Sequence, residues 1–273
     1  MRHLKIELIS VFPGVFNVSN IIVDDGLISI ITPAFRVENI IKDAIDSVIC
    51  QTYKKWEMLV ADDFSPDGTA SVVSALATRD ARVQLIRCKV NGGPAAARNT
   101  ALSAARGRWV AFLDSDDFWL PNKLEETINH AVTNHSALTY TGFRRISYDG
   151  AHTGGYISVP ATLTYKQLLG NTAIATSTVL IDRYLVGDFT MKRVFYDDFA
   201  CWLDILKKGF TAYGLNKDLM RYRVVSNSVS RNKLRSAVEV WKTYRQVEKL
   251  GLFRSSWYFS NYSLNGCRKY CRF

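Results

Sequence analysis

The chain lacks a long apolar run. No stretch reaches the roughly 18 consecutive apolar residues of a membrane-spanning helix, and Lys5, Glu7 and Asp24 interrupt the first 25 residues. This beginning also lacks the continuous apolar core and the small-residue cleavage site of a signal peptide. We therefore predict no spanning helix. We expect residues 1–26 to be an N-terminal extension that packs as a strand or contacts a membrane surface.

Cysteine and histidine are scarce. The five cysteines are an odd number, and the first three lie within apolar patterns, which indicates reduced thiols in a cytoplasmic protein. Cys267 and Cys271 have no second pair to complete a zinc ribbon. The four histidines are scattered and follow no predicted strand, so we expect none of them to be catalytic.

Negative charge is also in short supply. The chain has 35 Lys and Arg against 25 Asp and Glu, a formal charge of +10, which indicates an anionic partner or surface. Nucleic acid, a nucleoside diphosphate and the cytoplasmic face of a membrane all remain open on charge alone. Apolar residues make up 48% of the chain and charged residues 22%, which is typical of a folded globular protein and excludes global disorder.

Apolar periodicity predicts alternating strands and helices in the first half of the chain. A β-branched run is stopped by Thr32-Pro33, and apolar residues then recur at helical spacing. We expect strands at 27–31, 56–61, 83–86 and 109–113, and helices at 38–51, 69–78, 94–106 and 122–134. This order predicts an α/β fold with a mostly parallel central sheet flanked by helices.

The second half is less regular. Asp149-Gly150 and Gly154-Gly155 lie between alternating segments and predict a hairpin within 139–159. We also expect strands at 174–181 and 219–225, helices at 197–208 and 233–249, and a basic, aromatic tail after Leu252. The predicted domains are an extension at 1–26, a main domain at 27–230 and a C-terminal helical tail at 231–273.

Three polar clusters follow predicted strands. They are residues 33–36, Asp62-Asp63 and Asp114-Ser115-Asp116-Asp117. In open parallel sheets, ligands bind at the carboxyl ends of the strands. We therefore expect the three clusters to meet at one edge of the sheet and to form the functional site.

The acidic cluster after the fourth strand predicts a metal site. Asp114, Asp116 and Asp117 are so close in sequence that their carboxylates repel one another unless a cation is present. Mg²⁺ and Mn²⁺ take oxygen ligands and bridge carboxylates to a diphosphate. The alternative is a solvated turn whose aspartates cap the helix beginning near Pro121. The preceding strand and the two companion clusters favour the metal site.

Other candidate residues each have two interpretations. Asp63 can accept a hydrogen bond from a base N–H, as in uracil, or cap its own turn, and Phe35 can stack on a base or pack in the core. Arg98, in the helix that Pro94 opens, suits a diphosphate or an exposed helix face. Asp198 belongs to an Asp-Asp pair at a helix start. It can offset the helix dipole or take a proton from an attacking hydroxyl.

Taken together, these segments resemble the family 2 glycosyltransferases of the GT-A fold. The resembling segments are 28–35 (ISIITPAF), 46–53 (DSVICQTY), 60–65 (VADDFS), 92–99 (GGPAAARN), 112–117 (FLDSDD) and 197–203 (DDFACWL). Their order and spacing are far more specific than any one segment, and the resemblance covers about residues 27–230. It extends to the members that build bacterial surface polysaccharides such as O-antigen and capsule.

The resemblance implies an inverting sugar transferase with a nucleotide-sugar donor, expected to be a UDP-hexose. The implied acceptor is a saccharide or a lipid-linked saccharide. Asp198 is the implied general base, and Asp116 and Asp114 are the implied ligands of Mn²⁺ or Mg²⁺. The implied nucleotide-sugar contacts are Pro33, Phe35, Glu38, Asp63, Arg98, Asp114 and Ser115.

Two positions depart from the family pattern. Val225 stands where many members have a His that helps to hold the metal or the diphosphate. We therefore expect the metal to depend on Asp116, the diphosphate and water, with Arg221 or Arg223 assisting. Phe64 stands where Gly is usual after Asp-Asp, which leaves the geometry of that turn open.

Other classes explain the pattern less well. A nucleotidyltransferase would carry a Gly-rich basic loop after the first strand, and a Rossmann dehydrogenase would carry Gly-x-Gly-x-x-Gly. Residues 31–35 have neither. A nucleic-acid-binding module does not explain three acidic or polar strand ends. A catalytically impaired nucleotide-sugar-binding protein is an alternative because of Val225.

The tail after Leu252 mixes aromatic residues with Arg and Lys. This composition predicts peripheral contact with the anionic cytoplasmic face of the inner membrane. The alternative is a tail that packs on the catalytic domain.

Overall fold

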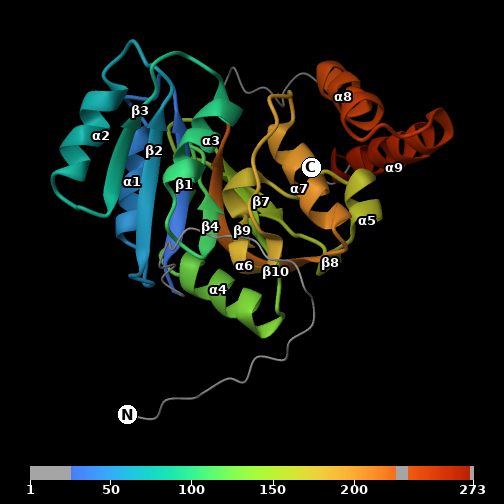
Figure 1. The fold of residues 1–273 in the computed structure, drawn as a ribbon, viewed down its shortest axis with the longest axis horizontal. Helices are drawn as coiled ribbons and strands as arrows, with labels where there is room; N and C mark the ends of the chain where they lie inside the picture. Colours follow the sequence, from blue (N-terminus) through green and yellow to red (C-terminus); the bar gives the residue numbers. More distant parts are fainter. Residues whose placement is uncertain (1–25, 226–232, 271–273) are drawn as a thin grey trace, which may run out of the picture.

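The computed structural model describes residues 26–225 and 233–270, which contain one sheet flanked by helices (Figure 1). The strands are β1 (Ile28–Ala34), β2 (Trp56–Asp62), β3 (Val83–Arg87), β4 (Trp109–Phe112), β5 (Phe118–Trp119), β6 (Leu138–Ile146), β7 (Thr153–Ile157), β8 (Thr162–Leu163), β9 (Leu180–Asp182) and β10 (Ala212–Arg223). The helices are α1 (Ile41–Ile49), α2 (Thr69–Ala77), α3 (Pro94–Ala104), α4 (Lys123–Thr133), α5 (Tyr165–Leu169), α6 (Arg183–Val186), α7 (Asp197–Lys207), α8 (Lys233–Lys242) and α9 (Leu252–Tyr270).

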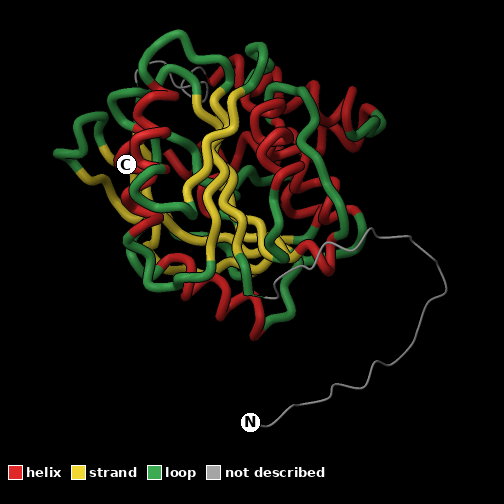
Figure 2. The backbone as a smooth tube through the Cα atoms, turned by 60° about the vertical axis from the view of Figure 1, so that its left-hand side comes forward, coloured by secondary structure: helices red, strands yellow, loops and turns green. Residues whose placement is uncertain are grey.

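The sheet has the strand order β3-β2-β1-β4-β9-β6-β10-β5, with β7 paired to β6 and β8 paired to β10. The first four strands in this order are parallel, as the β-α alternation predicts. The short strand β9 then runs antiparallel to both β4 and β6, so the second half of the sheet is mixed. Figure 2 shows the strands as one twisted layer with helices on both sides.

Alternation along β1 separates the two faces of the core. Ile28 and Ile30 belong to the core that includes residues of α1 and α2, whereas Ile31 belongs to the core that includes residues of α3 and α7. All seven residues of β2 are buried, which is typical of a central parallel strand. The carboxyl ends of these buried strands are therefore held rigidly, and the polar residues that follow them have fixed positions.

Strand β1 continues beyond its predicted end at Thr32-Pro33 and pairs with β2 as far as Ala34. The prediction is wrong there because the pairing between β1 and β4 ends at Ile31. The nitrogen of Pro33 points to the side of β4, where no ladder bond is lost by the missing N–H. Proline is tolerated in a central strand at this position, and β1 delivers the following residues directly to the site.

The predicted hairpin within 139–159 is confirmed by the antiparallel pair β6–β7. The strand predicted over 174–181 is mostly wrong, because Thr176–Thr178 form a 3-10 turn and the strand there is only Leu180–Asp182. The hydroxyl of Thr178 donates to the Ala175 carbonyl at 2.6 Å, and such local bonds compete with strand pairing. This turn becomes part of the site.

Helices α8 and α9 form the C-terminal helical tail, at the opposite end of the molecule from α1 and α2 (Figure 1). The helix predicted over 233–249 divides into α8 and a π-helical turn at Thr243–Val247. The predicted N-terminal extension lies outside the described residues, apart from Gly26, and the domain boundaries at 26 and 230 stay predictions.

Candidate active site

A cavity of about 1000 Å³ opens at the carboxyl ends of β1, β2 and β4. Strand ends, the start of α7 and the C-terminal helices all contribute to its wall. The predicted site residues that line it are Pro33, Phe35, Asp63, Arg98, Asp114, Ser115, Asp116 and Asp198. Residues far apart in the sequence thus meet in one cavity, as the shared sheet edge predicts.

Glu38 does not line this cavity, and its predicted contact with the nucleotide sugar gains no support from its position. Its carboxylate accepts a hydrogen bond of 2.6 Å from the Gly68 N–H, at the residue before α2. The acidic side chain thus satisfies a backbone donor at the N-terminus of that helix. Glu38 fixes a loop beside the site.

Two residues that line the cavity, Phe35 and Asp63, have the chemistry that a nucleobase requires, a ring surface and a hydrogen-bond acceptor. The Phe35 ring is 40% exposed and lines the cavity, with the Arg36 guanidinium 5.2 Å from its centroid. Buried Asp63 accepts hydrogen bonds from the N–H groups of Gly92 and Gly93 at 2.8 and 2.7 Å. These donors fix the carboxylate, and each of its oxygens keeps a second lone pair for a ligand N–H.

The turn after Asp63 is strained. Phe64 has a φ of 61° and is 60% exposed. This left-handed conformation is unfavourable for a bulky residue and free of steric cost for glycine. The geometry explains why glycine suits this position, and it shows that the chain retains the turn with phenylalanine in place.

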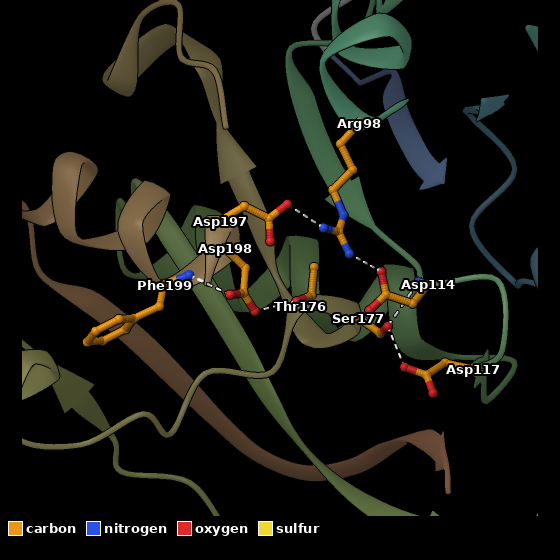
Figure 3. Close-up of polar contacts among 8 residues, drawn as sticks. All are labelled: Arg98, Asp114, Asp117, Thr176, Ser177, Asp197, Asp198 and Phe199. Atoms are coloured by element: carbon orange, nitrogen blue, oxygen red, sulfur yellow. Dashed lines mark hydrogen bonds and ion pairs between the residues drawn. The ribbon is translucent and has the colours of Figure 1, made fainter. Parts of the chain in front are cut away.

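The acidic loop after β4 is held from both ends. The hydroxyl of Ser177 accepts a hydrogen bond from the Asp114 N–H at 3.0 Å and donates to Asp117 at 2.6 Å (Figure 3). Asp117 also accepts from the Arg223 N–H at 3.0 Å. Burial, followed by the neighbouring charges of Asp116 and Asp114, raises the pKa of Asp117 well above its usual range. Asp117 lines the cavity, but both of its carboxylate oxygens already accept hydrogen bonds that hold the loop.

The carboxylate of Asp116 differs from that of Asp117 in its contacts. Within the described residues, its carboxylate forms no ion pair and no hydrogen bond with another side chain, and it lines the cavity. Burial, followed by repulsion from Asp114, raises the pKa of Asp116 to about 6. A carboxylate that lacks a partner and is disfavoured as an anion is a suitable ligand for a cation.

The residues present fit a divalent metal only when a substrate completes its coordination. Among the described residues, no group of three His, Cys, Asp or Glu side chains could hold a metal ion together. Asp116 and Asp114 offer carboxylate oxygens to the cavity. Mg²⁺ and Mn²⁺ are commonly held by one or two carboxylates together with substrate phosphates and water.

The predicted assistance from Arg221 and Arg223 takes another form. Arg223 is buried, and its guanidinium donates to the Asp116 carbonyl at 2.9 Å, to the Asp43 carboxylate at 2.7 Å and to the Tyr148 carbonyl. Arg221 pairs with Asp218 at 2.6 Å. Arg223 therefore holds the backbone of the acidic loop in place. Val225, two residues further along the chain, lines the cavity.

Arg98 lies between the two halves of the site. Its guanidinium pairs with Asp114 at 2.5 Å and with Asp197 at 2.7 Å (Figure 3). Burial alone would lower the pKa of Arg98, but the charges of Asp114 and Asp197 raise it overall. These contacts do not indicate the predicted role of Arg98 in binding a diphosphate. Both carboxylates already occupy the ends of the guanidinium, so Arg98 joins the acidic loop to α7.

Asp198 lies at the start of α7 and is half-buried in the cavity wall. One carboxylate oxygen accepts from the Thr176 hydroxyl at 2.7 Å and the other accepts from the Phe199 N–H at 2.6 Å. These bonds orient the carboxylate. Thr176 and Ser177 were missed in the sequence because their 3-10 turn was expected to be a strand. The Thr-Ser-Thr run was the signal, since hydroxyl side chains favour local turns.

Comparison with known proteins agrees with this geometry. The model of the family described as "Glycosyl transferase family 2" matches residues 29–197. The protein TuaG of Bacillus subtilis (strain 168), whose name assigns it to teichuronic acid biosynthesis as a glycosyltransferase, is 41% identical over 244 residues, covering 89% of this chain and 97% of TuaG. The Escherichia coli UDP-Glc:alpha-D-GlcNAc-diphosphoundecaprenol beta-1,3-glucosyltransferase WfgD is 37% identical over 248 residues, covering 90% of this chain and 96% of WfgD.

Solved structures share the fold at low sequence identity. S. aureus TarS 1-349 in complex with UDP-GlcNAc aligns with a TM-score of 0.67 and 18% identity, covering 86% of this chain and 71% of that chain. The mannosyltransferase PcManGT from Pyrobaculum calidifontis, in complex with GDP-Man and Mn²⁺, aligns with a TM-score of 0.66 and 17% identity, covering 92% and 77%. These likenesses support the GT-A fold. Together with the family match and with relatives that align over nearly their whole length, they show that the chain is an enzyme of glycosyltransferase family 2.

Proposed function

We propose that this glycosyltransferase transfers the hexose of a UDP-hexose to a hydroxyl of a lipid-linked saccharide, with inversion at the anomeric carbon. The single observation that carries the proposal is one cavity that Phe35 and Asp63, Asp114 and Asp116, and Asp198 all line. The strand order β2-β1-β4 places Asp63 and Phe35 on one side of the acidic loop, and Arg98 joins the loop to the start of α7, which carries Asp198 (Figure 3). This order matches a base, a diphosphate and an acceptor hydroxyl in sequence. The proposed pathway is bacterial surface polysaccharide biosynthesis, which the names of TuaG and WfgD support.

The donor is held from its uridine end. The exposed Phe35 ring offers a stacking surface for uracil, and Asp63 accepts a hydrogen bond from the uracil N3–H. Pro33, in β1, and Ser115, in the acidic loop, also line the cavity, and we assign them contacts with the ribose and the diphosphate. The relative WfgD is named for a UDP-Glc donor, which makes UDP-glucose the first hexose to test.

Asp116, with Asp114, is the proposed ligand of Mn²⁺ or Mg²⁺. When bound, the cation supplies positive charge beside the leaving diphosphate. The Mn²⁺ in the complex of PcManGT supports this assignment. Because Arg98 already pairs with Asp114, we assign the larger share of metal binding to Asp116.

Asp198 is the proposed general base. Its oriented carboxylate takes the proton of the acceptor hydroxyl as that oxygen attacks the anomeric carbon. The bond between the anomeric carbon and the UDP oxygen breaks, and UDP leaves with the bonding electrons. Attack from the side opposite to the diphosphate inverts the anomeric carbon.

The acceptor and the cellular location follow from the same proposal. WfgD is named for an acceptor whose GlcNAc is linked to undecaprenol through a diphosphate. An enzyme with such an acceptor works at a membrane surface, and we propose peripheral attachment to the cytoplasmic face of the inner membrane. In the part of the chain that the structure describes, no helix is long and apolar enough to span a bilayer.

A donor panel tests the proposed function. UDP-glucose, UDP-galactose, UDP-GlcNAc and GDP-mannose are each incubated with the enzyme, Mn²⁺ and a GlcNAc-diphosphate acceptor on a short polyprenyl or alkyl chain. We expect binding of UDP-sugars over GDP-mannose and transfer from one UDP-hexose. Selective transfer from GDP-mannose would contradict the uridine site at Phe35 and Asp63.

A further inference from the structure

Helix α9 packs on the protein with one side only. Ser255 is fully buried, and Tyr258, Phe259 and Tyr262 pack against the main core. Tyr262 also lines the active-site cavity. The Asn265 side chain donates to the Gly170 carbonyl at 2.9 Å, which ties the helix to the residue after α5. This side fixes the position of α9 beside the cavity.

The opposite side of α9 is also apolar. Phe253 is 93% exposed, Trp257 68% and Leu264 58%, and Leu252 next to them is 60% exposed. Positions 253, 257 and 264 are spaced by one and two helical turns, so their side chains share one face. We name Phe253, Trp257 and Leu264 the outer face of α9. A helix with apolar residues on two opposite sides needs a second partner besides its own core.

The charges around this face are positive. The C-terminal segment described from residue 233 to 270 has two acidic residues, Glu239 and Glu248. Glu239 pairs with Lys242 at 2.8 Å, and Glu248 pairs with Lys207 at 2.6 Å. Three exposed basic residues of the same segment, Arg245, Lys249 and Arg254, form no ion pair within the described residues. From Leu252 to the end of the chain, the sequence contains Arg and Lys but no Asp or Glu. The partner of the outer face should therefore be apolar and anionic.

We propose that the outer face of α9 docks on the surface of an anionic lipid bilayer. An aromatic and aliphatic stripe with adjacent basic residues is the arrangement of helices that lie in the plane of the interface. The inference deepens the proposed function, since a lipid-linked acceptor is confined to that surface. The inner side of the same helix carries Tyr262 into the cavity wall, so docking through the outer face holds the cavity near the membrane.

Flotation with lipid vesicles tests the docking without any substrate. The full chain is mixed with vesicles of phosphatidylcholine alone or with about one third phosphatidylglycerol. We expect binding to the anionic vesicles only. The F253S/W257S double variant should bind at least about tenfold more weakly, because two interfacial aromatic anchors are lost. Val132→Ser is the matched control, because Val132 is 56% exposed on α4, and it should bind like the unchanged protein.

Three results would overturn the docking. The first is equal binding of the double variant and the unchanged protein to the anionic vesicles, and the second is no binding of the unchanged protein to them. The third is self-association of the unchanged protein without vesicles that the double substitution abolishes, which identifies a second copy as the partner. Transfer to a water-soluble short-chain acceptor should be unchanged in the double variant. If the unchanged protein transfers no sugar to this acceptor, the proposed function is contradicted. The flotation result does not depend on that outcome.

Discussion

The Arg98 guanidinium pairs with Asp197 at 2.7 Å, although the two residues lie 99 positions apart in the chain. The same guanidinium pairs with Asp114 in the acidic loop. Asp197 immediately precedes Asp198, the proposed base, at the start of α7. One buried arginine therefore sets the acidic loop, where the diphosphate is proposed to lie, against the helix that carries the base.

This relationship predicts the effect of removing the arginine. Arg98→Met leaves Asp114 and Asp197 close together without a counter-charge. We expect the free energy of unfolding to fall by about 3–5 kcal/mol, as measured by urea denaturation. Arg79→Met, at an exposed arginine, is the control and should change it by less than about 0.5 kcal/mol. Equal effects in the two variants would show that the bridge does not hold the site together.

Asp116→Asn tests the metal ligand. The variant keeps the shape of the side chain but removes the charge, so we expect Mn²⁺ to lose its effect on UDP-sugar binding, with affinity falling at least about tenfold. Isothermal titration with and without a chelator measures this. Glu38→Gln is the control and should bind as the unchanged protein does, since Glu38 lies outside the cavity. If a chelator does not affect the unchanged protein, the metal assignment is wrong.

Phe64→Gly tests the strained turn. A left-handed φ of 61° costs a phenylalanine about 1–2 kcal/mol, and glycine avoids that cost at the expense of a more flexible unfolded chain. We expect the free energy of unfolding to rise by up to about 1 kcal/mol. Phe64→Ala keeps the Cβ and so should give no such gain. A similar rise in both variants would attribute the effect to the loss of an exposed ring instead.

Lys123 predicts a dependence of stability on pH. It is fully buried, its ammonium group has no hydrogen-bond partner within the described residues, and it lies 4.1 Å from the centroid of Trp119. Burial lowers the pKa of Lys123 to about 7 from the 10.5 of an exposed lysine. Between these two values the unfolded chain binds more protons than the folded chain. The destabilisation caused by this group is therefore complete below pH 7 and decreases as the pH rises toward 10.5.

Lys123→Met should remove this destabilisation. At pH 6 we expect the free energy of unfolding to rise by on the order of 1–3 kcal/mol, with a smaller gain at pH 9. Lys89→Met, at an exposed lysine, should give no gain at either pH. A gain for Lys123→Met that does not vary with pH would contradict the buried, perturbed ammonium group.

The sequence contains the signals for the sheet and for most of the cavity. Alternation of buried strands and amphipathic helices predicted the parallel half of the fold, and polar residues after β1, β2 and β4 predicted where the cavity opens. These features depend on local periodicity. The continuation of β1 through Pro33 could not be predicted in this way, because it depends on where the pairing with β4 ends.

The partners of the charged residues were also beyond a local reading. Arg98 was expected to face a diphosphate and instead pairs with two carboxylates that tertiary packing brings to it. Asp117 looked like a third metal-site carboxylate, but Ser177 and the Arg223 backbone bind it. In each case the contact joins segments that are distant in the chain, so no spacing or composition in the sequence carries it.

The central claim is that Asp198 is the base in sugar transfer from a UDP-hexose, and the Asp198→Asn variant tests it most directly. Binding of the UDP-hexose and single-turnover transfer are measured on the same preparation, and the anomeric configuration of the product is read by NMR. The account predicts inverted product from the unchanged protein. It predicts unchanged donor binding in the variant, with transfer slowed roughly 10²–10⁴-fold. Near-normal transfer by the variant, or a product with retained configuration, would contradict it.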